Sequence, residues 1–253
     1  MGGVVTGKSV LVTGAASGIG KACVSYLLAG DNHVTAMDLD ESALKRAFQT
    51  SPAGRLKLIA GDVSQANDCA EAVDAAAKAF GKLDALMNWA GVHSTMTWEE
   101  VTGEHLQRIL AVNTVGSFLI AQAAARRMKA TGGGAIMLTS STSIIHAPTG
   151  GPAGNGGPAY VTSKAAIVGL VRTLARALGP HNIRVNGIVP GVTDTPMIGN
   201  YSEETRQLQR ERSPLGRIGT PEELAEAGCL LISDASRYVS GEMLIVNGGT
   251  IFG

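Results

Sequence analysis

A tyrosine and a lysine four residues apart have the clearest chemical potential in this sequence. Tyr160 and Lys164 fall in the segment 159–164 (AYVTSK), whose helical character places both on one helix face. A cationic ammonium beside a phenol favours the phenolate and lowers the tyrosine pKa, so Tyr160 could serve as a general acid or base. Such a pair is often an ordinary surface pair. This one, however, follows a predicted strand ending in the hydroxyl residues 139–141, at the edge where doubly wound sheets bind ligands.

A glycine-rich turn follows the first predicted strand and opens directly into a helix. Residues 13–20 read TGAASGIG, with Gly14, Gly18 and Gly20 at the turn. Glycines in this context let backbone N–H groups approach a pyrophosphate at the positive end of the helix. The turn therefore predicts a dinucleotide site rather than a plain strand-to-helix connection.

The second predicted strand ends in an acid, Asp38, 18 residues beyond Gly20. A carboxylate there can accept hydrogen bonds from the adenosine ribose and would repel a 2′-phosphate. Neither Ser17 nor Leu39 supplies the cation that an NADP site needs, so we predict NAD(H). Asp62, which precedes Val63 after the third strand, could accept from the adenine amino group or simply cap a helix.

Composition and charge exclude several classes of protein. The chain has 253 residues, 33 of them Gly, with 45% hydrophobic residues and zero net charge. No basic run exceeds the pair 126–127, so nucleic acid is not an expected partner. Three scattered cysteines, Cys23, Cys69 and Cys229, indicate reduced core thiols and no metal site. Without a signal sequence or a run of about 18 apolar residues, we expect a soluble, cytoplasmic protein with no membrane association.

Short apolar runs alternate with longer helical segments, the pattern of repeated βαβ units. We predict one α/β domain over 1–253, a Rossmann-like doubly wound parallel sheet of about seven strands flanked by helices. The predicted strands are 9–13, 33–38, 56–60, 85–88, 135–140, 184–188 and 243–246. The predicted helices are 19–29, 42–50, 65–80, 99–113 continuing through 115–129, 159–178 and 221–232, the last with Thr220 as its cap.

Two segments interrupt this alternation. Residues 148–158 (PTGGPAGNGGP) lie in a glycine- and proline-rich insertion of about 144–158, and residues 193–219 form a long stretch without strand pattern. Loops of this length are often lids or binding loops, so we expect them to shape the substrate pocket. The pocket residues expected from them are Ile144, His146, Met197, Ile198 and Tyr201. Of the five histidines, only His93 and His146 fall near the expected site.

The order of these motifs over nearly the whole chain resembles the classical short-chain dehydrogenases/reductases. The matching segments are TGxxxGxG at 13–20, 88–91 (NWAG), Asn113, Ser141, YxxxK at 160–164, and 190–191 (PG). The resemblance implies that Tyr160 transfers the proton, Ser141 steadies the substrate oxygen, Lys164 holds the ribose and tunes Tyr160, and Asn113 anchors a relay water. It also implies a homotetramer. The cofactor-binding residues expected are Gly14, Ser17, Gly18, Ile19, Gly20, Asp38, Asp62, Val63, Asn88, Ala90, Gly91, Tyr160, Lys164, Pro190, Gly191, Val192 and Thr195.

Two departures from the family pattern concern the site. Trp89 stands where the family usually has a second Asn, and the interval from Ser141 to Tyr160 is longer than usual, which leaves Ser140 and Ser143 as alternative serines. The implied activity is NAD(H)-dependent interconversion of a secondary alcohol and a ketone. A 3-oxoacyl-[acyl-carrier-protein] reductase or related acyl-thioester reductase is the alternative, and a non-catalytic NAD-binding scaffold is a third hypothesis.

Overall fold

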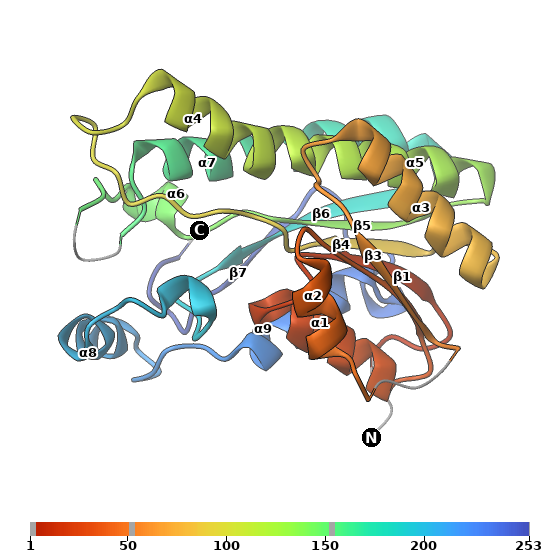
Figure 1. Ribbon diagram of the computed structural model, residues 1–253, viewed down its shortest axis with the longest axis horizontal. Coiled ribbons are helices and arrows are strands. Elements are labelled where there is room, and N and C mark those ends of the chain that lie inside the picture. The colour runs from red at the N-terminus through yellow and green to blue at the C-terminus, as the bar shows by residue number, and fades with distance from the viewer. Residues whose placement is uncertain (1–3, 51–53, 152–154, 253) are drawn as a thin grey trace.

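All seven predicted strands form one sheet in the computed structural model, which describes residues 4–50, 54–151 and 155–252. Every pairing is parallel, and the order is β3-β2-β1-β4-β5-β6-β7 (Figure 1). The strands are β1 (Ser9–Thr13), β2 (His33–Asp38), β3 (Leu56–Ala60), β4 (Ala85–Asn88), β5 (Gly134–Thr139), β6 (Ile183–Pro190) and β7 (Met243–Val246). The predicted Rossmann-like sheet is therefore confirmed.

The central strands are buried along their whole length because helices cover both faces of the sheet. All residues of β1 and β4 are buried, and both strands are mainly apolar. The chain order reverses at β1, which lies between β2 and β4. Crevices at the carboxyl ends of strands open at such a switch point, so the fold itself fixes where a ligand can bind.

Two helical layers sandwich the sheet (Figure 1). Helices α1 (Gly18–Ala29), α2 (Glu41–Ala47) and α9 (Pro221–Ile232) enclose one hydrophobic core, and α3 (Ala66–Phe80), α5 (Ser117–Ala130) and α7 (Pro158–Leu178) enclose the other. The predicted start of α9 is confirmed by a capping box in which Thr220 and Glu223 exchange hydrogen bonds between side chain and backbone.

Helices α4 (Gly103–Leu110) and α5 form one continuous helical segment. Helix α4 passes through a π-helical turn, η1 (Ala111–Gly116), directly into α5. The predicted continuation of the helix past residue 113 is confirmed, and the structure adds a widened turn there that the sequence does not predict. By length and composition alone, 103–130 could cross a membrane, contrary to the expectation that no segment is apolar enough. Its apolar side packs on the sheet and on α3 and α7, as a core helix does.

Both irregular segments contain short helices that the sequence does not predict. Helix α6 (Ser143–His146) lies in the glycine- and proline-rich insertion, and α8 (Glu203–Arg212) lies in the stretch 193–219. The stretch 193–219 also contains the 3-10 turn η3 (Pro196–Ile198). Two further 3-10 turns lie outside these segments, η2 (Gly179–His181) after α7 and η4 (Asp234–Ser236) after α9.

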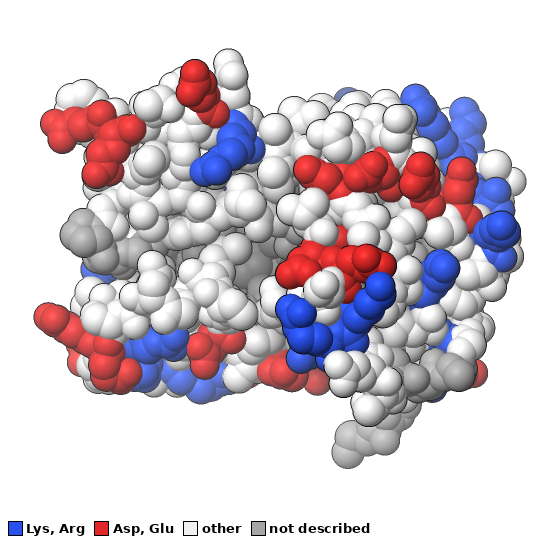
Figure 2. All heavy atoms as spheres, in the orientation of Figure 1, with Lys and Arg blue, Asp and Glu red and all other residues white. Residues whose placement is uncertain are grey.

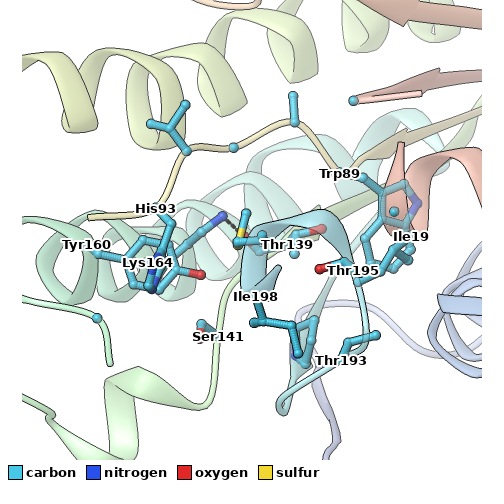
Figure 3. A pocket seen from close by; sticks show the side chains of 18 of the residues that line it. Ile19, Trp89, His93, Thr139, Ser141, Tyr160, Lys164, Thr193, Thr195 and Ile198 are labelled. Carbon is cyan, nitrogen blue, oxygen red and sulfur yellow. Dashed lines mark hydrogen bonds between the residues drawn. The ribbon is translucent and has the colours of Figure 1, made fainter. Parts of the chain in front are cut away.

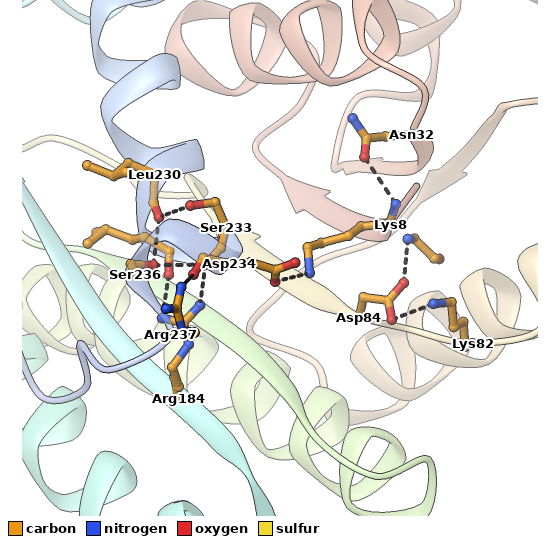
Figure 4. Close-up of polar contacts among 12 residues, drawn as sticks. Lys8, Asn32, Lys82, Asp84, Arg184, Leu230, Ser233, Asp234, Ser236 and Arg237 are labelled. Carbon is orange, nitrogen blue, oxygen red and sulfur yellow. Dashed lines mark hydrogen bonds and ion pairs between the residues drawn. The ribbon is translucent and has the colours of Figure 1, made fainter. Parts of the chain in front are cut away.

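The sheet edge opposite the strand carboxyl ends is tied together by charged groups (Figure 4). Lys8, just before β1, forms an ion pair of 2.8 Å with Asp234, just after α9. Arg184 in β6 donates hydrogen bonds to the carbonyls of Leu231, Ser233 and Val239. These contacts anchor the end of α9 to the sheet.

On the visible face, a row of acidic side chains crosses the right half above a smaller basic cluster, and the left-central part is largely uncharged (Figure 2). The three cysteines are buried free thiols in the two cores, as expected for Cys23, Cys69 and Cys229.

Candidate functional site

A cavity of about 800 Å³ opens at the carboxyl ends of the strands, between the glycine-rich turn and helix α7. It is lined by residues from both halves of the chain. The predicted residues that line it are Gly14, Ser17, Gly18, Ile19, Gly20, Asp38, Asp62, Val63, Ala90, Gly91, Ser141, His146, Tyr160, Lys164, Pro190, Gly191, Val192, Thr195, Met197, Ile198 and Tyr201. Three predicted residues do not line it, namely Asn88, Asn113 and Ile144.

The glycine-rich turn leaves no room for side chains, as a dinucleotide cradle requires. Gly14 and Gly18 have φ values of +64° and +51°, and a Cβ on Gly14 would lie 2.8 Å from the nitrogen of Ala90. A Cβ on Gly20 would lie 2.1 Å from the carbonyl oxygen of Gly14. The N-terminus of α1 therefore faces the cavity with bare backbone, and these residues fit a bound pyrophosphate.

The two acids at the edge of the cavity are held by backbone N–H groups. Asp38 accepts from the nitrogen of Ala16 at 2.9 Å and from that of Asp40 at 3.2 Å. Asp62 accepts from the nitrogen of Ser64 at 2.8 Å. Asp38 thus lies at the end of β2 beside the turn, where a ribose would lie. The side chain of Asp62 organises the turn before α3, although the residue still borders the cavity.

Tyr160, Lys164 and Ser141 meet at one end of the cavity (Figure 3). Tyr160 and Ser141 both border this end of the cavity, and Ser141 lies close enough to Tyr160 to lower its pKa. The Nζ of Lys164 donates to the carbonyl of Thr139 at 3.0 Å and lies 5.9 Å from the centre of the Tyr160 ring. Helix α7 therefore presents both predicted residues to the strand end of β5, and the predicted constellation is assembled.

Burial sets the protonation of this pair. The pKa of Tyr160 is raised, mainly by desolvation, with Ser141 lowering it by hydrogen bonding and Tyr201 raising it further. Desolvation lowers the pKa of Lys164 to about 8. The expectation that Lys164 brings the tyrosine pKa down is therefore wrong for the protein alone, because the cost of burying a phenolate dominates.

The two alternative serines also border the cavity, but they differ in their hydrogen bonding. Ser140 is buried and its hydroxyl donates to the carbonyl of Lys164 at 2.8 Å. Ser143 is buried too, and its hydroxyl has no hydrogen-bond partner in the described part of the chain. Of the three serines, only Ser141 affects the pKa of Tyr160, and Ser141 therefore stays the predicted one.

Asn113 lies behind the cavity wall within the π-helical turn. Its Oδ1 accepts from the nitrogen of Val92 at 2.8 Å, and its Nδ2 donates to the carbonyl of Val92 at 2.9 Å and to Ser163 Oγ at 2.9 Å. The side chain thus ties the segment after β4 to α7. π-Helical turns are frequent at functional sites, and here the turn places Asn113 between two cavity-lining segments.

Asn88 and Trp89 make contacts that hold neighbouring elements together. Buried Asn88 accepts from Thr13 and donates to Ser117 at 2.8 Å, so it links β4 to β1 and α5. Trp89 does line the cavity, near Ile19 and Thr195 (Figure 3). A Cβ on Gly228 of α9 would lie 2.7 Å from the Trp89 ring, so the absence of a side chain there makes space for the indole.

His93 lies beside Tyr160, and no role in the site was predicted for it from the sequence. Their ring centroids lie 4.5 Å apart with an interplanar angle of 73°. The pKa of His93 is lowered by burial and by the charge of Lys164. Further lining residues come from the two irregular segments that the sequence predicts to shape the pocket, although they were not singled out individually; they are Pro148, Asn155, Gly156 and Arg212. Thr142, just before α6, also lines the cavity and was not predicted.

The sequence is similar to a protein family and to several characterised dehydrogenases and reductases. The family model described as enoyl-(acyl carrier protein) reductase matches residues 14–250. An NAD-dependent glycerol dehydrogenase of Listeria innocua is 37% identical, with 97% of this chain and 94% of that protein covered. A 3-oxoacyl-[acyl-carrier-protein] reductase of Thermotoga maritima is 33% identical, with 97% and 98% covered.

A solved structure shares the whole fold. The short-chain dehydrogenase/reductase of Brucella melitensis described as a glucose/ribitol dehydrogenase superimposes with a TM-score of 0.92 over 100% of both chains, at 27% identity.

Proposed function

The chain belongs to the short-chain dehydrogenase/reductase family of oxidoreductases that act on CH–OH donors, and on that premise we propose that it interconverts a secondary alcohol and a ketone with NAD(H). The observation that carries the proposal is the meeting of Ser141, Tyr160 and Lys164 at one end of a cavity whose other end is a glycine-rich turn. These three side chains have the chemistry for moving a proton next to a bound dinucleotide.

The cofactor is held from both sides of the cavity. The turn at Gly14–Gly20 would hold the pyrophosphate, Asp38 the adenosine ribose and the segment 190–195 the nicotinamide, since all of them border the cavity. When bound, the nicotinamide accepts or supplies the hydride. The carboxylate of Asp38 favours NAD over NADP because it would repel a 2′-phosphate, and the L. innocua relative is described as NAD-dependent.

Proton transfer passes through Tyr160. In the oxidation direction, its phenolate accepts the proton of the substrate hydroxyl, while Ser141 holds the same oxygen by hydrogen bonding. The ammonium of Lys164, which lies 5.9 Å from the centre of the Tyr160 ring, would bind the ribose hydroxyls of the nicotinamide half. Asn113, bonded to Val92 and Ser163, keeps the segment after β4 and α7 at a fixed distance.

A single substitution tests this proposal. Tyr160→Phe removes the hydroxyl and should lower the rate of NAD⁺-dependent oxidation of a responsive alcohol by about 10³-fold or more. Losses of this size are expected when a general acid–base group is removed. The binding of NADH, measured by calorimetry, should persist. Tyr238→Phe is the control, since Tyr238 is fully exposed. An unchanged rate in Tyr160→Phe would refute the assignment.

The substrate is a small secondary alcohol, and the apolar residues Met197 and Ile198 suit cyclic or hydrophobic ones. Relatives are described as acting on glycerol, on 3α-hydroxysteroids and on 3-oxoacyl chains, so an acyl-thioester reductase is the second candidate. Initial rates with NADH and NADPH on an acetoacetyl thioester decide between the two. A non-catalytic scaffold is the least supported reading because the four predicted catalytic residues are all present.

The assembly and the location of the protein are further parts of this proposal. We expect a homotetramer formed through α5 and α7, working in the cytoplasm on a small molecule. Light scattering on the purified protein measures the assembly directly.

A further inference from the structure

We propose that His93 recognises a second oxygen of the substrate, on a carbon one or two bonds from the carbon that is oxidised. The substrate class is therefore a vicinal diol or the corresponding hydroxyketone, and His93 determines that specificity. This inference rests on the proposed function because it places the reacting hydroxyl at Tyr160.

The position of His93 is the first support. Its ring meets the ring of Tyr160 edge to face, with centroids 4.5 Å apart, and both residues line the same cavity (Figure 3). A substrate whose hydroxyl bonds to Tyr160 and Ser141 therefore has its neighbouring carbons within reach of the imidazole.

The hydrogen-bonding state of His93 is the second support. Within residues 4–50, 54–151 and 155–252, its ring nitrogens make no hydrogen bond to protein, and neither nitrogen is sealed from the cavity. Its pKa is lowered by burial and by Lys164, so the ring is neutral at physiological pH. A neutral imidazole has one donor and one acceptor, and a hydroxyl can meet either.

The glycine-rich insertion holds His93 in place, which is the third support. The nitrogen of Gly157 donates to the carbonyl of Ser94 at 2.8 Å, and that of Gly151 donates to the carbonyl of Thr95 at 2.7 Å. On its other side, the Ser94 hydroxyl hydrogen-bonds the ring of His105 at 2.7 Å. The residues directly after His93 are thus fixed from two directions, as a selective contact requires.

A purely structural role makes a different prediction. If His93 only packs against Tyr160, a phenylalanine keeps the edge-to-face contact and changes every substrate alike. If His93 binds a substrate oxygen, the phenylalanine leaves that oxygen without its partner and affects only substrates that have it.

The experiment compares two alcohols of the same ring size, cyclohexanol and trans-cyclohexane-1,2-diol, on the wild type, His93→Phe and His93→Asn. We expect His93→Phe to lower kcat/KM for the diol by about tenfold or more, and for cyclohexanol by less than about threefold. His93→Asn, which retains a donor and an acceptor, should recover part of the diol activity. Equal losses on both alcohols, or none on either, overturn the inference.

A binding measurement keeps this result separate from failure of the proposed function. In the NADH complex, the His93 ring resonances, assigned by their absence in His93→Asn, should shift on saturation with the diol and not with cyclohexanol. Diol binding that leaves these resonances unmoved, or no diol binding at all, overturns the inference whether or not any alcohol is turned over. A shift without turnover of any alcohol refutes the redox assignment alone.

Discussion

The ammonium nitrogen of Lys164 donates a hydrogen bond of 3.0 Å to the backbone carbonyl of Thr139, where α7 crosses the carboxyl end of β5. Only 4% of Lys164 is exposed, and no carboxylate forms an ion pair with it among the described residues. One carbonyl dipole does not compensate for the lost hydration of a cation. The fold therefore tolerates a local destabilisation at the centre of the site.

Replacing Lys164 by Met should change how stability depends on pH. The folded-state pKa of Lys164, about 8, lies below the ordinary 10.5, so its burial penalty is present in full below pH 8 and disappears as the pH rises through 10.5. Urea unfolding should show that the stability of Lys164→Met relative to wild type falls by about 2 to 3 kcal/mol between pH 7 and 10.5. Exposed Lys78→Met is the control, and a pH-independent difference for Lys164→Met would contradict the burial argument.

Asp38→Asn should relax the preference for NAD. The amide keeps an oxygen to accept from Ala16 but loses the charge that opposes a 2′-phosphate. We expect kcat/KM with NADP⁺ to rise relative to NAD⁺ by on the order of tenfold, measured as initial rates with each cofactor. Asp40→Asn removes a nearby charge that caps α2 and should leave the ratio unchanged. The ribose role of Asp38 is refuted if its own ratio stays where it was.

Trp89 should report cofactor binding by fluorescence. It lines the cavity near Ile19, whereas the other tryptophan, Trp98, is 74% exposed and does not line it. Addition of NADH should quench the protein emission by energy transfer to the nicotinamide. Trp89→Phe should lose most of this quenching and Trp98→Phe should keep it. Equal quenching in both variants would mean that the dinucleotide lies elsewhere.

Arg184→Ala should destabilise the protein without changing the active site. The guanidinium donates to three carbonyls, at 2.8, 3.0 and 3.2 Å, at the end of α9 and in the loop before β7. Losing these charged donors should lower the free energy of unfolding by about 2 kcal/mol. Arg237→Ala, which removes one long bond of 3.3 Å to Asp234, is the matched control. Similar stability of the two variants would show that the three carbonyls find water instead.

Regular elements were predictable because burial and periodicity agree in them. The strands β1 and β4 are short apolar runs between helices. Helix α9 begins with a threonine cap followed by proline and two acids, a start signal that is visible in the sequence. Helix α8 was missed because its residues are almost all charged or polar and have no apolar face. The serine cap at Ser202, followed by two acids, is the signal that could have indicated it.

The candidate site was predictable where spacing alone brings groups together. Tyr160 and Lys164 share one helix face, and the glycines of the turn are adjacent in sequence. The partnerships of Asn88 and Asn113 could not be predicted, since they depend on which neighbours the folded chain brings within hydrogen-bond distance. The contact of His93 with Tyr160 joins residues 67 positions apart, and no local pattern encodes it.

The π-helical turn 111–116 makes the long helix sensitive to the number of its residues as well as to their identity. A π-helical turn holds one residue more than the α-helical turn it replaces. Deleting one residue here would let the ladder close as a plain α-helix, while α4 and α5 would keep nearly the same faces toward their neighbours. The deletion would therefore act mainly on Asn113, whose place in the widened turn brings it within hydrogen-bond distance of Val92. The extra residue serves the cavity wall rather than the hydrophobic core.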